Sequence, residues 1–107
     1  MNLVIAVISF GKYLQKLKNS LLQNAATASA NKAIELYKES IKIEKELGDR
    51  RGVAYTLAQL GLLYKEIGEK EKAIKCMEEA LKMFEQMGLK RDAEKARKQL
   101  KYLKLTM

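Results

Sequence analysis

The feature that most constrains this chain is an internal repeat. The segment from Lys32 to Leu63 recurs forty residues later, from Lys72 to Leu103, with ten identities. In the second copy the identical residues are Lys72, Ala73, Ile74, Glu79, Lys82, Gly88, Arg91, Gln99, Leu100 and Leu103. A period of this length is typical of helical hairpins stacked as a solenoid, in which each unit buries its apolar face against its neighbours. Such a surface favours binding over catalysis.

Composition narrows the fold and the chemistry further. The 107 residues suffice for one domain, and 48% of them are hydrophobic, which is enough for a modest core. Proline is absent and glycine is limited to six residues, so the sequence predicts an all-α protein. The absence of histidine excludes catalytic triads, histidine proton shuttles and the common zinc sites. We therefore expect no enzyme activity, no catalytic residue, no metal site and no cofactor.

The single cysteine and the first ten residues bear on location. Cys76 lies in a helical pattern, where a small buried thiol is the ordinary role, and one cysteine forms no disulfide within one chain. The apolar run Met1–Phe10 lacks the basic start of an export signal. Ser9, Gly11 and Lys12 interrupt it well before the roughly twenty residues that a membrane span needs. The sequence predicts a cytoplasmic protein with no membrane span.

The net charge of +8 is concentrated at the ends of the chain. Residues 32–89 carry eleven basic and eleven acidic side chains, whereas residues 90–107 carry seven basic and two acidic ones. This local excess favours an anionic partner, whether an acidic peptide, a nucleic acid or a membrane surface. The alternative is a solvated face that serves only solubility.

Four helices can be placed from residue 31 onward. We expect Asn31 to cap a helix running to about Leu47, where Gly48 ends it. Its core face comprises Ile34, Tyr37, Ile41 and Leu47. The short connection that follows predicts antiparallel packing with the next helix.

The other three helices are predicted from the same kinds of capping residue and helix-ending glycine. Asp49 caps a helix that Gly68 ends, and further helices span about residues 70–87 and 90–105. The predicted inner residues are Val53, Leu57, Leu60, Leu63, Tyr64 and Ile67, then Ala73, Ile74, Met77, Ala80, Leu81 and Phe84, then Ala93, Ala96, Leu100 and Leu103. Basic residues occupy the rest of the last helix, as expected where a terminal helix caps a solenoid.

The N-terminal third is less regular. Apolar residues from Leu3 to Ala28 recur at steps of three and four, which favours a long helix, although the β-branched run Val4–Ile8 would suit a short strand. Helix is the preferred interpretation because no other strand is available for pairing. We therefore expect one domain over residues 1–107. It consists of an irregular helical segment (1–30), repeat helices (31–88) and a basic capping helix (89–107).

Residues 54–87 resemble the tetratricopeptide repeat, a helix-turn-helix unit defined by large and small apolar residues at fixed places. Those places hold Leu57, Leu60, Gly61, Tyr64, Ala73, Met77 and Ala80. A half-formed copy contains Ala33, Tyr37 and Ser40. The resemblance implies a short right-handed solenoid in which Gly61 and Ala73 let the two helices of a hairpin approach closely.

The resemblance also implies a concave groove, lined by the first helix of each hairpin, that holds a peptide or helix of another protein. The matching groove candidates are Tyr55, Ala58, Leu62, Lys65, Lys95, Lys98 and Tyr102. Leu62 and Tyr55 would give apolar contact, and the lysines would attract an acidic partner. Tyr55 and Tyr102 could instead be partly buried core residues.

Two other functions compete with peptide binding. The basic C-terminal helix could bind nucleic acid, although no array of base-stacking aromatic residues accompanies its charge. Residues 1–30 could form a homodimer by exchanging a helix, or could fold back as a cap on the first hairpin.

Overall fold

The computed structural model describes residues 28–105, and within that range it is entirely helical apart from three turns. The leading helix, described over residues 28–46, is followed by α2 (Arg50–Glu66), α3 (Lys70–Gln86) and α4 (Lys90–Leu105). Residues 28–105 contain no strand, and the all-α prediction is confirmed.

By internal contacts the chain divides into two units, Met1–Asn31 and Lys32–Met107, and apart from the helical residues 28–31 the description below concerns the second unit. The predicted long N-terminal helix, its alternative strand and the dimer through residues 1–30 fall wholly or mainly outside the described residues. The predicted arrangement as one domain stays a prediction.

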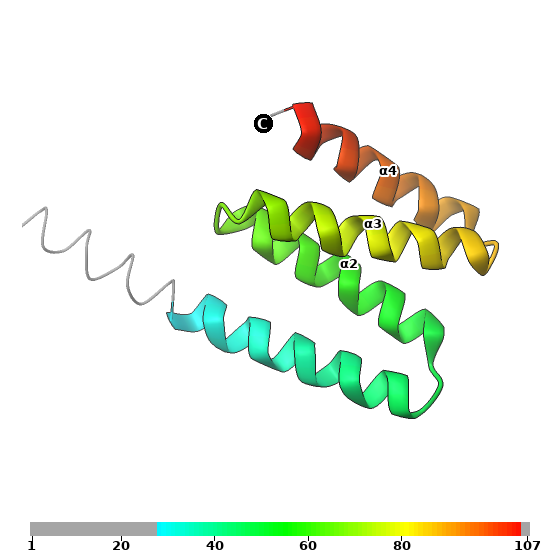
Figure 1. Ribbon diagram of the computed structural model, residues 1–107, viewed down its shortest axis with the longest axis horizontal. Helices are drawn as coiled ribbons and strands as arrows, with labels where there is room; N and C mark the ends of the chain where they lie inside the picture. Colours follow the sequence, from blue (N-terminus) through cyan, green and yellow to red (C-terminus); the bar gives the residue numbers. More distant parts are fainter. Residues whose placement is uncertain (1–27, 106–107) are drawn as a thin grey trace, which may run out of the picture. The chain divides into compact units, whose positions relative to one another are not determined.

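Three turns of the same design reverse the chain direction. Gly48, Gly68 and Gly88 each have a positive φ, of 71°, 84° and 71°, which side chains rarely tolerate. The amide that follows each glycine donates to a carbonyl five residues back, in the pairs Asp49 to Glu44, Glu69 to Tyr64 and Leu89 to Phe84, at 2.8–2.9 Å. This is the hydrogen bonding of a glycine-terminated helix. Successive helices therefore run antiparallel, as Figure 1 shows.

Asp49 caps α2 as predicted, because its side chain accepts a hydrogen bond of 2.9 Å from the Gly52 amide. Asn31, in contrast, does not cap the leading helix, so that prediction is wrong. Residues 28–30 are already helical and Asn31 continues them, since Ala28 and Ala30 are strong helix formers.

The core-face prediction fails at two helix ends. Leu47 is 76% exposed and Ile67 is 41% exposed, although both continue the apolar periodicity. Leu47 lies in a turn and Ile67 is the residue that ends α2. The periodicity runs past the part of each helix that a neighbour covers, so these side chains reach solvent.

Two groups of buried residues hold the four helices together. One consists of Val53, Ala54, Leu57, Met77, Ala80, Phe84, Ala93, Ala96 and Leu100, and the other of Leu60, Tyr64, Ala73 and Leu103. Ile34, Tyr37 and Ile41 of the leading helix pack against them. The four predicted core residues of α4 are all buried.

Gly61 shows how closely α2 and α3 approach. A Cβ atom at this position would lie 3.2 Å from the Met77 Cε, 3.3 Å from the Ala73 carbonyl oxygen and 3.4 Å from the Cys76 Cβ. The close approach predicted for Gly61 and Ala73 is therefore present, and a larger residue at position 61 would push α3 away.

Candidate functional site

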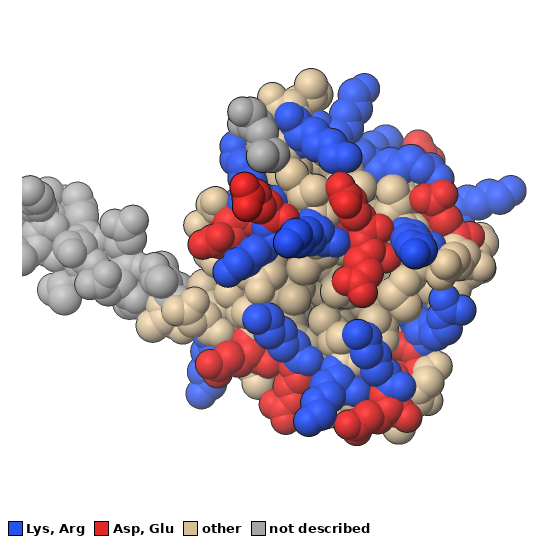
Figure 2. Space-filling model, in the orientation of Figure 1, with Lys and Arg blue, Asp and Glu red and all other residues tan. Residues whose placement is uncertain are grey.

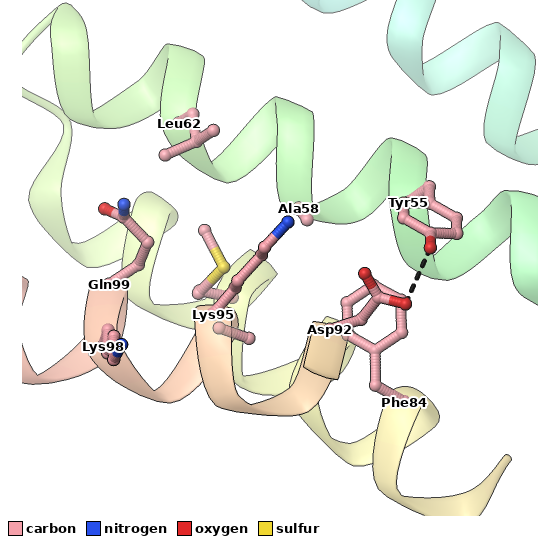
Figure 3. Close-up of a pocket in the computed structure, with 10 residues that line it drawn as sticks. Tyr55, Ala58, Leu62, Phe84, Asp92, Lys95, Lys98 and Gln99 are labelled. Carbon is pink, nitrogen blue, oxygen red and sulfur yellow. Dashed lines mark hydrogen bonds between the residues drawn. The ribbon is translucent and has the colours of Figure 1, made fainter. Parts of the chain in front are cut away.

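A groove of about 330 Å³ lies between α2 and α4, with α3 as its floor (Figure 3). It is lined by Tyr55, Ala58, Leu62, Met77, Phe84, Asp92, Lys95, Ala96, Lys98 and Gln99. α2 and α4 flank it because both pack against α3. Helical spacing of three and four residues turns successive lining positions of each helix toward it.

A hydrogen bond joins α2 and α4 at one end of the groove. The Tyr55 hydroxyl donates to Asp92 Oδ2 at 2.7 Å (Figure 3). The Tyr55 ring meets the edge of Phe84, with centroids 5.3 Å apart and planes at 67°, and Arg51 lies 5.7 Å from the ring centroid. Tyr55 is 37% exposed, so it belongs both to the groove wall and to the contact with the core.

A second cross-link joins α2 and α4 further along. Lys65 Nζ donates to Gln99 Oε1 at 3.3 Å and lies 4.5 Å from the centroid of the Tyr102 ring, a cation–π contact. Tyr102 is 54% exposed. The groove is thus bridged by polar side chains near both ends, and the space between the bridges is open.

Lysine side chains of α4 border this open space. In Figure 3 the Lys95 side chain extends from α4 toward Ala58 of α2, with its ammonium group near the opposite wall. No carboxylate of residues 28–105 forms an ion pair with Lys95, whereas Lys98 pairs with Glu94 at 3.7 Å on a largely exposed part of α4. Lys95 is therefore the ammonium group positioned to meet an anion in the groove.

The floor of the groove is apolar. Met77, Phe84 and Ala96 are buried core residues that close its base, and Leu62 on the α2 wall is 38% exposed. An apolar side chain placed in the groove would cover mainly the exposed surface of Leu62 and Tyr55 on the α2 wall, at about 25 cal/mol per Å² of apolar surface. The groove can therefore accept an apolar group beside a carboxylate.

Five of the seven predicted groove residues line this space: Tyr55, Ala58, Leu62, Lys95 and Lys98. The other two, Lys65 and Tyr102, lie against each other at the Gln99 bridge. Sequence reasoning missed the two α4 residues that form the bridges, Asp92 and Gln99. Gln99 could have been singled out from the sequence, because it is one of the residues that are identical forty positions apart. Asp92 could not, because the equivalent residue in the preceding repeat is Gly52.

The charge on α4 is partly compensated by α3. Arg97 approaches Glu85 at 4.0 Å and Lys104 approaches Glu78 at 3.5 Å, all four side chains being more than half exposed. Figure 2 shows Lys and Arg gathered over α4, in the upper part of the view, with acidic side chains among them. Exposed pairs of this kind contribute little to stability, about 0–1 kcal/mol each.

The remaining chemical groups offer no second kind of site within the described residues. Burial raises the pKa of the half-buried Cys76 thiol, which keeps it protonated and unreactive at neutral pH. Residues 28–105 hold no cluster of three or more potential metal ligands. No helix in this range is long and apolar enough to span a membrane.

Antiparallel helix pairs with a forty-residue period, close contact at Gly61 and an open groove beside α2 define a helical-repeat protein. The chain belongs to the tetratricopeptide repeat family, whose profile matches residues 24–86. Members of this family generally mediate protein–protein interactions and act as non-enzymatic scaffolds. A search among curated proteins found no match.

Proposed function

We propose that this chain binds an acidic segment of another protein in the groove between α2 and α4. The observation that carries the proposal is the Lys95 ammonium group, which extends over an apolar floor without an ion-pair partner among residues 28–105. A carboxylate of the partner would pair with it, and Lys98 at the groove margin would add a second positive charge.

The size of the groove favours an extended segment over a whole helix. About 330 Å³ accommodates a few side chains, and the two polar bridges limit the length of the open floor. One apolar side chain would rest against Leu62 and Met77 while a neighbouring Asp or Glu reaches Lys95. Asp92 at the Tyr55 end would repel an acidic residue, so the acidic part of the partner is directed toward the Gln99 end.

The ion pairs of α4 favour an acidic peptide over nucleic acid. Arg97, Lys98 and Lys104 each have a carboxylate within 4.0 Å, which lowers the positive potential that a polyanion would encounter. An exposed aromatic group for stacking is limited on this helix to Tyr102. A cytoplasmic location belongs to the same proposal, since a lone protonated thiol suits a reducing compartment.

The test is a titration of the ¹⁵N-labelled chain with two short synthetic peptides followed by NMR. The first has one leucine flanked by glutamates, and the second replaces the glutamates with glutamines. We expect the amide signals of Ala58, Leu62 and Lys95 to shift with the acidic peptide, and Lys95→Glu to weaken binding at least tenfold.

Lys101→Glu is the matched control, because it changes the same charge on the same helix outside the groove lining. Its effect should be small. Equal losses for Lys95→Glu and Lys101→Glu would show a diffuse charge attraction and refute the groove as the binding site. Preference of both variants and the native chain for the uncharged peptide would refute the acidic partner.

A further inference from the structure

The α4 wall of the groove carries two opposite charges. Asp92 and Lys95 both line the groove, with Asp92 half-buried at the Tyr55 end and Lys95 exposed three residues further along α4. Within residues 28–105 neither side chain forms an ion pair at 4.0 Å or less. A segment bound in the groove therefore meets a carboxylate at one end and an ammonium group beside it.

The Asp92 carboxylate keeps capacity for a cation. Its Oδ2 accepts the Tyr55 hydroxyl hydrogen bond at 2.7 Å, and in Figure 3 its second oxygen is turned away from that bond. An ionised carboxylate has about four acceptor sites, so one hydrogen bond leaves room for an ammonium or guanidinium group.

The surroundings of Tyr55 already accommodate a cation of this chain. The Arg51 guanidinium lies 5.7 Å from the centroid of the Tyr55 ring. Arg51 is exposed and does not line the groove, so it leaves the groove side of Asp92 accessible. A basic side chain that enters the groove can therefore contact the Asp92 carboxylate and the Tyr55 ring together.

The other part of the α4 wall favours the opposite charge. Gln99 lines the groove one turn beyond Lys95, and its Oε1 accepts from Lys65, so its Nε2 group can donate. A carboxylate beside Lys95 and Gln99 would receive one charge-assisted and one neutral hydrogen bond. Ala58 and Leu62 on the facing α2 wall suit an apolar side chain.

The spacing of these groups fits an extended segment. Asp92 and Lys95 are about 4.5 Å apart along the axis of α4. Side chains two residues apart in an extended chain point to the same side at a separation of about 7 Å, a difference that long side chains span. The residue between them points to the other side, toward the α2 wall.

We infer that the partner segment carries a basic and an acidic residue with one apolar residue between them. The basic side chain contacts Asp92 and the Tyr55 ring, and the acidic one contacts Lys95. The apolar side chain packs on Leu62. The charge order along α4 fixes which end of the segment lies at Tyr55. This inference rests on the proposed peptide-binding function and adds a cation subsite to it.

Two peptides that differ in one residue test the inference on the ¹⁵N-labelled chain by NMR titration. The first carries lysine, leucine and glutamate in succession between uncharged residues, and the second has glutamine in place of the lysine. We expect the native chain to bind the lysine peptide about fivefold more tightly. In Asp92→Asn this advantage should fall below twofold. Asparagine keeps the oxygen that accepts from Tyr55, so the variant removes the charge and retains the bridge.

Glu71→Gln is the matched control. Glu71 is the acidic residue in the first turn of α3, as Asp92 is in α4, and it does not line the groove. Its removal should leave the fivefold advantage of the lysine peptide unchanged. An equal loss of this advantage in Glu71→Gln and Asp92→Asn would show a diffuse attraction and overturn the cation subsite.

A nitroxide attached beside the lysine of the first peptide locates the basic side chain. It should broaden the amide signals of Tyr55 and Asp92 more than those of Lys65 and Tyr102. The reverse order would overturn the inference.

The affinities separate this inference from the proposed function. Equal affinity of the native chain for the two peptides, or a lysine advantage that persists in Asp92→Asn, would overturn the cation subsite and leave the acidic contact with Lys95 standing. If neither peptide shifts the amide signals of Ala58, Leu62 and Lys95, the proposed function is refuted and the inference with it.

Discussion

α2 and α4 occupy equivalent places in successive repeats, and they share one face but differ in the other. The shared face holds Leu60 in α2 and Leu100 in α4, both buried. The second face of α2 is apolar and packs against α3, whereas the equivalent positions of α4 are charged and exposed. The pairs are Ala54 with Glu94, Leu57 with Arg97, Gly61 with Lys101 and Tyr64 with Lys104.

The difference teaches that the second face, which changed between the repeats, is apolar where a described helix covers it and charged where none does. In α2 that face is used by α3, which approaches closely enough to exclude a side chain at Gly61. In α4 the same face carries ion pairs to α3 through Arg97 and Lys104. α4 thus presents charged side chains on the face that is apolar in α2.

The largest effects should come from the shared face. Leu60→Ala and Leu100→Ala should each lower the free energy of unfolding by about 3 kcal/mol, since each removes a fully packed side chain. Urea denaturation followed by circular dichroism measures both. Leu62→Ala, at a 38% exposed position, is the control and should cost about half as much, about 1–1.5 kcal/mol, because the side chain is only partly covered and its removal leaves no closed cavity. A Leu100→Ala variant as stable as Leu62→Ala would show that α4 is not packed on α3.

The changed face should give the next largest effect, and on α2 alone. Gly61→Leu should destabilise the chain by about 2 kcal/mol, because its side chain would collide with Met77 and the Ala73 backbone. Lys101→Leu at the equivalent place in α4 should change stability by no more than about 0.5 kcal/mol. The same denaturation experiment compares them. Similar losses for both would contradict the difference between the two faces.

The bridge between the two helices should contribute less. Tyr55→Phe removes the hydrogen bond to Asp92 and should lower the free energy of unfolding by about 1 kcal/mol or less, since the bond is exposed. Asp92 also supplies the acidic residue in the first turn of α4, so a double-mutant cycle with Asp92→Ala, which removes the acceptor, is needed to isolate the pair. Additive effects in the cycle would mean that the bridge is not formed in solution.

The smallest effect concerns Cys76, which packs beside Gly61 on the α2–α3 contact. Burial raises the pKa of its thiol in the folded chain above the value of about 8.5 in an unfolded one. The protonated Cys76 thiol therefore contributes to the free energy of unfolding in full below about pH 8.5, and this contribution is lost as pH rises through the folded-state pKa. Cys76→Ser should flatten the decline in stability between pH 8 and 10, measured by denaturation across that range. An unchanged pH profile would assign the decline to other groups.

The sequence by itself determined the repeat and the positions at which its helices begin and end. The glycine at each helix end, the Asp49 cap and the four apolar residues of α4 all act through contacts a few residues apart, which local spacing encodes. The same local rule failed at Asn31, because the helix-forming residues before it extend the helix past this capping residue. It also failed at Leu47 and Ile67, because the apolar periodicity continues beyond the part of the helix that a neighbouring helix covers.

The tertiary structure alone decided which residues meet across the groove. Tyr55 and Asp92 are 37 residues apart and Lys65 and Gln99 are 34 apart, so neither pair corresponds to the forty-residue period. Their meeting depends on how α2 and α4 each pack on α3, which also places Met77 and Phe84 at the groove floor. The helical period in the sequence determines on which face of its helix a side chain lies. Only the packing of α2, α3 and α4 against one another determines which side chain of another helix it contacts.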